Sequence, residues 1–115
     1  MSRAEASPAA ARPIAVVTTV ASRDDARRIG LAMVDRNLAA CAQVSAIDSI
    51  YRWKGVVQEE PEFRLLLKTT EARYAAVEAA IRDLHPYDLP AIHAFAFAHV
   101  DEAYAAWIAE NAAGG

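Results

Sequence analysis

The sequence has a single cysteine and lacks the common short motifs of cofactor and metal enzymes. With one thiol the chain cannot form an internal disulfide, so Cys41 is either a small buried apolar residue or a free thiol. There is no Gly-rich phosphate loop, no GxGxxG, no CxxC and no HExxH. These absences disfavour the common cofactor enzymes, and no local signature marks a catalytic nucleophile.

Long basic runs and long apolar runs are missing as well. The formal net charge is -3, and without a basic run we expect no nucleic-acid partner. A membrane helix needs about 18 or more apolar residues in a row, so we expect no membrane partner. The apolar stretch IAVVTTVA (14–21) is too short for a span, and we interpret it as a strand of a cytoplasmic protein.

The overall composition is that of one globular domain. Apolar residues make up 55% of the 115 residues and charged residues 23%, which excludes a disordered or fibrous chain. Residues 1–12 are rich in Ala, Ser and Arg without periodicity, and we expect them to form a disordered tail. Residues 13–112 then form the domain.

The first half of the domain predicts a strand, a helix and a long hairpin. β-branched residues dominate 14–20, and Ser22 is expected to cap a helix because two acidic residues follow it in the first turn. From Cys41 the period changes to two, and the KG turn before the extended run 62–69 predicts a hairpin whose centre, Leu65 to Leu67, is covered on both faces. The apolar arc expected to be buried in the helix consists of Ala26, Ile29, Leu31, Met33, Val34 and Leu38.

The second half predicts a helix over 70–84, a strand over 90–100 and a last helix over 101–111. Pro86 stops the first of these helices, and because a residue before proline is pushed to extended dihedrals, His85 is the exit residue. The last helix should begin at the cap Asp101 and bury a stripe of three residues, Tyr104, Trp107 and Ile108.

The resulting order of elements is βαββαβ followed by α, which predicts an α+β fold of the ferredoxin-like type. In that arrangement an antiparallel sheet carries both crossover helices on one face, and the C-terminal helix is an addition. The central strands have apolar or aromatic residues on both faces, which two helices cannot cover. A second molecule would supply the missing layer.

The stretch LHPYDLP (84–90) allows two interpretations. His85 and Asp88 flank a turn, where a divalent metal could use an imidazole and a carboxylate. Alternatively, these side chains bond the free carbonyl and amide groups at the end of the helix. His93 and His99, six residues apart on one strand face, would lie about 20 Å apart and could not share an ion.

Other polar and aromatic residues have structural as well as functional interpretations. Lys68 ends a strand among apolar neighbours, and Glu62 of the same hairpin is the candidate partner for a structural ion pair, favoured over a catalytic lysine. Tyr51 and Trp53 share one strand face. This arrangement favours interface anchors over a platform that stacks a ligand.

Five blocks in the right order, RNLAACAQV, SIYRWKG, LLLKTT, HPYDLP and YAAWI, resemble the CutA family of divalent-cation tolerance proteins over residues 14–110. The resemblance implies a homotrimer similar in architecture to the PII signalling proteins, with a role in tolerance of copper or other divalent metals. It implies no enzyme activity. The alternatives are a PII-like signalling or scaffolding trimer that binds a protein partner without a metal function, and an uncharacterised activity at the trimer cleft.

Most residues that the family usually has are present, but of the ligand set of copper-linked members only His85 remains. Thr18 and Leu84 stand where copper-linked members have a cysteine and a histidine, and Ala91 replaces a customary carboxylate. Copper favours imidazole and thiolate, so we expect Cu²⁺ or another divalent cation to bind only weakly, with His85 and Asp88 of the turn as the candidate ligands. The resemblance also implies candidates for the trimer interface or cleft, which are Tyr51, Trp53, Glu62, Lys68 and Tyr87. The other residues that match the family are Cys41, Gly55, Thr69, Pro86, Pro90, Tyr104 and Trp107.

Replacing Pro86 by Ala should destabilise the fold by about 1 kcal/mol, because two prolines restrict the unfolded chain between helix and strand. Urea unfolding measures this loss. If the substitution instead abolished metal or partner binding at unchanged stability, LHPYDLP would be a binding site first and a helix stop second.

Overall fold

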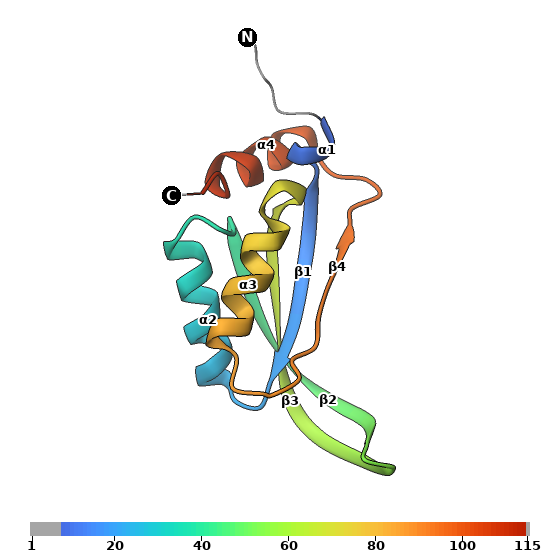
Figure 1. Ribbon diagram of the computed structural model, residues 1–115. Helices are drawn as coiled ribbons and strands as arrows, with labels where there is room; N and C mark the ends of the chain where they lie inside the picture. The colour runs from blue at the N-terminus through green and yellow to red at the C-terminus, as the bar shows by residue number, and fades with distance from the viewer. Residues whose placement is uncertain (1–7, 115) are drawn as a thin grey trace.

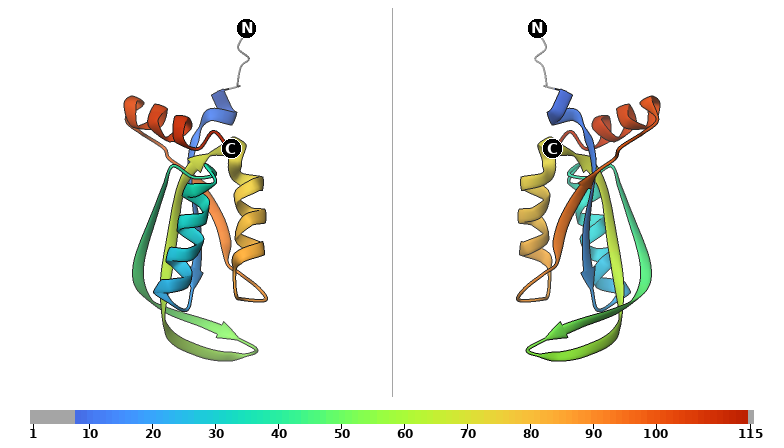
Figure 2. Two further views of the ribbon diagram at one scale, coloured as in Figure 1. Left: turned by 90° about the vertical axis from the view of Figure 1, so that its left-hand side faces the viewer. Right: turned by 90° about the vertical axis from the view of Figure 1, so that its right-hand side faces the viewer.

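The computed structural model describes residues 8–114, and its elements follow the expected order (Figure 1). The four strands form one antiparallel sheet in the order β2-β3-β1-β4, and α2 and α3 lie on one face of it (Figure 2). This confirms the α+β fold with an antiparallel sheet. The elements are α1 (Pro8–Ala11), β1 (Pro13–Val20), α2 (Arg23–Asp35), β2 (Cys41–Trp53), β3 (Val56–Thr70), the 3₁₀ turn η1 (Glu71–Arg73), α3 (Tyr74–Leu84), β4 (Ile92–Ala96) and α4 (Glu102–Asn111).

The N-terminal segment differs from the expected tail of residues 1–12. Pro8–Ala11 form the short helix α1, and the carbonyl of Arg12 accepts a hydrogen bond of 2.9 Å from the Glu71 amide. The Arg12 guanidinium also lies 3.7 Å from the Glu71 carboxylate. Regular structure therefore begins before residue 13, and the remainder of the expected tail, residues 1–7, lies outside the described residues.

Helix α2 begins at its expected cap but buries a narrower face than its sequence predicts. The Ser22 hydroxyl accepts a hydrogen bond of 3.1 Å from the Asp25 amide, which satisfies one of the free donors of the first turn. Gly30 is buried, and a Cβ there would lie 3.1 Å from the Cβ of Ala42 on β2, so the glycine permits close packing. Two residues expected in the buried arc are exposed, Leu31 at 63% and Val34 at 40%.

The hairpin of β2 and β3 is longer than the sequence indicates. Its strands pair without a break from Cys41 opposite Lys68 to Trp53 opposite Val56, so β3 begins six residues earlier than the run 62–69. Lys54 and Gly55 have φ angles of 51° and 82°, which is the left-handed pair that a two-residue hairpin turn requires. The far half of the hairpin projects past the helices as a free arm (Figure 1).

The centre of β3 buries its apolar side chains mainly beneath α2 and α3. The side chains of Leu65 and Leu67 point to the helices and are fully buried, together with Val77 and Ile81 of α3. Leu66, on the other face, is only half-buried. Leu65 to Leu67 were expected to be covered on both faces of the sheet, but the cover is complete only on the face that carries α2 and α3.

The C-terminal third needs two corrections. β4 ends at Ala96, so the alternation predicted to continue to residue 100 does not form a strand there, and His93 and His99 do not share a strand. In α4 the cap Asp101 is confirmed by its bond of 2.9 Å from the Tyr104 amide, but Trp107 is 43% exposed and only Ile108 of the expected stripe is fully buried. α4 lies across the end of the sheet where β1 begins (Figure 1). Within residues 8–114 no helix has the length and apolar character needed to cross a membrane.

Candidate functional site

The site begins where α3 ends. The His85 amide still bonds the Ile81 carbonyl at 2.8 Å, but the backbone of His85 is extended, with φ -77° and ψ 135°. Pro86 imposes this conformation, which confirms His85 as the exit residue. The chain then turns back along the sheet towards β4.

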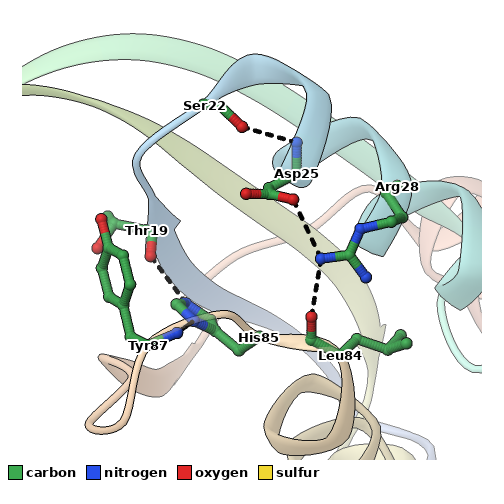
Figure 3. A network of polar contacts seen from close by, with 7 residues as sticks. All are labelled: Thr19, Ser22, Asp25, Arg28, Leu84, His85 and Tyr87. Carbon is green, nitrogen blue, oxygen red and sulfur yellow. Dashed lines mark hydrogen bonds and ion pairs between the residues drawn. The ribbon is translucent and has the colours of Figure 1, made fainter.

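Both ring nitrogens of His85 are engaged (Figure 3). The Tyr87 amide donates to Nδ1 at 3.1 Å, so Nδ1 carries no proton and Nε2 donates to the Thr19 carbonyl at 2.9 Å. The residue is only 8% exposed, and burial lowers the pKa of the imidazole against the opposing effect of the Thr19 hydrogen bond. A neutral ring thus ties the loop to β1, which is the arrangement expected of the hydrogen-bonding interpretation.

An arginine holds the same loop from the other side. The guanidinium of Arg28 on α2 lies 3.1 Å from the Asp25 carboxylate and donates to the Leu84 carbonyl at 2.9 Å (Figure 3). That carbonyl belongs to the last turn of α3, where the backbone lacks helical partners. Arg28 therefore couples the start of α2 to the end of α3 next to His85.

Tyr87 links the loop to the hairpin. Its hydroxyl donates to the Glu62 carboxylate at 2.9 Å, and its ring lies 4.8 Å from the His85 ring at an angle of 59°. Burial, followed by the hydrogen bond to Glu62 and its negative charge, raises the pKa of the Tyr87 phenol well above its usual value. The phenol therefore stays protonated and acts as a donor.

The expected ion pair of Lys68 with Glu62 is wrong. Glu62 is the acceptor for Tyr87, and the ammonium of Lys68 donates to the Tyr104 hydroxyl at 3.0 Å. This hydrogen bond raises the pKa of Lys68, which keeps the amine charged and unsuited to act as a nucleophile. Tyr104 in turn stacks on Trp107 at 5.8 Å, and the free thiol of Cys41, which is half-buried, stands opposite Lys68 in the sheet.

Two hollows meet at Tyr51 and Tyr87, and we name them together the tyrosine cleft. The first has a volume of about 300 Å³ and the second about 360 Å³. The cleft brings together four of the five interface or cleft candidates and Asp88, while Lys68 lies elsewhere on β3. The first hollow is lined by Tyr51, Trp53, Tyr87, Asp88 and Leu89, and the second by Thr19, Ser49, Ile50, Tyr51, Glu62, Tyr87 and Ala91.

Leu89 and Thr19 were not expected at this site. Leu89 is 71% exposed, and an apolar residue beside Pro90 in a turn is a signal that could have marked it. Thr19 carries no such signal, because its contribution to the loop is the backbone carbonyl that His85 reaches.

The residues proposed to hold a metal do not form a ready site. Across residues 8–114 no group of three or more His, Cys, Asp or Glu side chains is placed to hold a metal ion. His85 would have to release the Tyr87 amide from Nδ1 before that nitrogen could coordinate. The hydroxyl of Thr18, at the position of the missing thiol, is fully buried and has no hydrogen-bond partner among the described residues.

Comparison with known proteins gives consistent matches across the chain. The family model of the CutA1 divalent ion tolerance protein matches residues 14–111. A divalent-cation tolerance protein CutA from Thermus thermophilus is 41% identical over 97 residues, which are 84% of this chain and 94% of that protein. A solved structure of the protein from that species, Cut A1, superposes with a TM-score of 0.82 at 39% identity and covers 86% of this chain and 97% of its own. A structure described as the periplasmic divalent cation tolerance protein CutA from Archaeoglobus fulgidus has a TM-score of 0.84 at 27% identity, covering 87% and 98%.

Acidification should destabilise the fold through His85. Burial lowers the pKa of the folded imidazole below the value of about 6.5 expected in the unfolded chain. The unfolded chain therefore takes up the proton first, so this contribution is complete above about pH 6.5 and is lost as the pH falls towards the folded pKa. Urea unfolding in chelator-containing buffer should give a lower free energy of unfolding at about pH 5.5 than at about pH 7.5, with at most about 1.4 kcal/mol per pH unit from this group.

Glutamine at position 85 tests the assignment, because it offers a donor and an acceptor but does not titrate. His85→Gln should flatten the pH dependence, and His93→Gln on the exposed strand β4 is the matched control that should keep it. Equal slopes in both variants and the parent would show that His85 is not the group responsible.

Proposed function

The chain belongs to the CutA1 divalent ion tolerance family, and on that basis we propose that it acts in tolerance of or response to divalent metal ions, copper among them. The observation that carries the proposal is the family match over residues 14–111 together with 41% identity to a divalent-cation tolerance protein. The family takes its name from a tolerance function and not from a reaction, which supports a binding role without catalysis. We place this role in the cytoplasm, although the Archaeoglobus fulgidus relative is described as periplasmic.

We further propose that metal binding is weak. Thr18, Leu84 and Ala91 supply no thiolate, imidazole or carboxylate, and copper favours the first two of these donors. His85 retains an imidazole, but its coordination competes with the hydrogen bond from the Tyr87 amide. Asp88, which is exposed at the same turn, would supply the second ligand.

A homotrimer is the assembly that we propose, and the exposed arm of the hairpin supports it. Ile50 is 68% exposed, Trp53 48%, and Val56 and Val57 59% each, which is much apolar surface for one short segment. β2 and β4 are the outer strands of the sheet, so each leaves an edge open to pairing. Three copies around a threefold axis could cover the arms and the edges of one another.

A second candidate function is a signalling or scaffolding trimer that binds a protein partner. The observation in its favour is an apolar patch away from the tyrosine cleft, where α2 meets the outer strand β2. Leu31 and Val34 are exposed there beside a hollow of about 210 Å³. Capture of a partner that is lost on Leu31→Glu, at unchanged assembly, would favour this candidate over the metal function.

Calorimetric titration with Cu²⁺ should give a dissociation constant on the order of 1 µM or weaker, since one imidazole and one carboxylate form a poor copper site. His85→Ala should weaken binding further, and His93→Ala on β4 is the matched control that should not. A nanomolar site that survives His85→Ala would show that the ligands lie elsewhere.

Static light scattering of the purified chain at micromolar concentration should give three times the chain mass of 12.4 kDa. Trp53→Asp should shift the protein to monomer or to insoluble material, because it places an unpaired charge in an apolar contact. Ala79→Asp adds the same charge to the exposed side of α3 and should leave the assembly intact. A stable folded monomer of the parent chain would exclude the proposed assembly.

A further inference from the structure

The two outer strands of the sheet have edges without blocking residues. β2 is the outer strand on one side and β4 on the other. Native proteins usually protect an open edge with Lys, Pro or an inward-pointing charge. Residues 41–47 of β2 and all of β4 contain no Lys, Arg, Asp, Glu or Pro. Phe95 of β4 is 50% exposed, and Ala94 and Ala96 are exposed beside it. Both edges are therefore suited to pairing with another strand.

The strand directions allow β2 of one copy to pair with β4 of the next. Every neighbouring pair within the sheet is antiparallel, so along the order β2-β3-β1-β4 the two outer strands run in opposite directions. Copies that join edge to edge in a closed ring have the symmetry axis along the general direction of the strands, and rotation about that axis preserves the direction of each strand. β2 and the β4 of the next copy therefore meet antiparallel, which continues the pattern of the sheet.

Residues at the two edges lie at matching levels along the strands. The row of paired residues that begins at Ala42 on β2 crosses β3 and β1 and ends at Ala94 on β4. The members of this row on β3 and β1 belong to the core beneath the helices, so Ala42 and Ala94 are on the helical face. The adjacent row begins at Cys41 and ends at Phe95, and its side chains are on the opposite face.

A hollow lies beside each edge on the helical face, and the charged residues of the two hollows have opposite signs. The hollow between α2 and β2 has a volume of about 210 Å³ and includes Ala42, and the hollow between α3 and β4 has about 250 Å³ and includes Ala94. Arg27 lines the first and has no hydrogen-bond or ion-pair partner within residues 8–114. Glu71 lines the second, 3.7 Å from the guanidinium of Arg12. These charges favour contact between unlike edges over contact between like edges.

We propose that β2 of one copy pairs antiparallel with β4 of the next, so that three copies form one continuous ring of strands. The partner is a second copy of this chain. The face that carries α2 and α3 points outward, and the opposite face of the sheet points to the axis (Figure 2). The inference rests on the homotrimer proposed above and adds which edges meet, in which direction and with which faces on the same side. The apolar patch of Leu31 and Val34 then borders the seam between two copies.

Pairing of unlike edges also explains why the assembly would stop at a small ring. It is a head-to-tail contact, in which each copy uses one edge towards each neighbour, and such a contact closes when the last copy meets the first. Pairing of β2 with β2, or of β4 with β4, would be a twofold contact that leaves the second edge of each copy open. A closed ring leaves no edge unpaired along the seam.

A disulfide between copies tests the seam in the full chain, with the native thiol as one half. At matching levels Phe95 of one copy lies opposite Cys41 of the next, and opposed residues of antiparallel strands have Cα atoms about 4.5–5.5 Å apart, which a disulfide can bridge. Within one copy the same two positions are three strand spacings apart, about 14 Å, and cannot bond. Phe95→Cys treated with the thiol oxidant diamide should therefore give covalent dimers and trimers on non-reducing electrophoresis.

Further variants control for the partner thiol, the face and the register. Cys41→Ser combined with Phe95→Cys should give no covalent species. Ala94→Cys places the thiol on the helical face and is the matched control that should not crosslink to Cys41. His93→Cys covers a slip of two residues caused by strand tilt, which keeps the faces and moves position 93 opposite Cys41. Gln43→Cys with His93→Cys, on a Cys41→Ser background, tests the level register while the exposed ring of Phe95 stays in place.

Light scattering of each variant under reducing conditions separates the seam from the assembly. Trimers that give no covalent species in Phe95→Cys, in His93→Cys or in the variant with Gln43→Cys would overturn the seam and leave the homotrimer standing. A covalent dimer that persists without Cys41 would also overturn the seam, because the contact would then join two β4 edges. A monomeric parent chain would exclude the homotrimer and the seam with it.

Discussion

The candidate site depends on one neutral imidazole. His85 receives the Tyr87 amide on Nδ1 and donates from Nε2 to the Thr19 carbonyl, at 3.1 and 2.9 Å. A protonated ring could not accept the first of these bonds, and an exposed ring would lose both to water. Burial therefore stabilises the protonation state that the geometry needs.

The hydrogen bonds that begin at His85 continue through Tyr87 to the hairpin. Tyr87 is held at its amide by the imidazole, and its hydroxyl reaches Glu62 on β3 at 2.9 Å. Arg28 fixes the preceding carbonyl, that of Leu84, to the start of α2. The loop is thus anchored to β1, β3 and α2, and this anchoring positions Tyr87 in the wall of the tyrosine cleft.

The same contacts explain why a residue can look like a metal ligand in the sequence and behave otherwise in the fold. Thr18, Leu84 and Ala91 lack the donors that copper favours, and His85 uses its nitrogens to hold the loop. Family membership and the set of metal donors in this chain therefore support different conclusions. The first supports a tolerance function, whereas the second limits how tightly any metal could be held.

The sequence by itself determined the features that depend on neighbouring residues. Ser22 and Asp101 cap their helices, Lys54 and Gly55 close the hairpin, and Pro86 turns His85 out of α3, because each effect acts within a few residues. The five motif blocks likewise identified the family without the fold.

Only the tertiary structure decided the partners. Glu62 bonds Tyr87 and Lys68 bonds Tyr104, across 25 and 36 residues of sequence, instead of pairing with each other within the hairpin. Periodicity predicted which side chains share a face of a helix, but not how much of that face a neighbouring element covers. Leu31 therefore lies exposed on α2, where a buried arc was expected. The physical reason is that periodicity and capping are local, whereas burial and hydrogen-bond partners depend on the elements that the folded chain brings alongside.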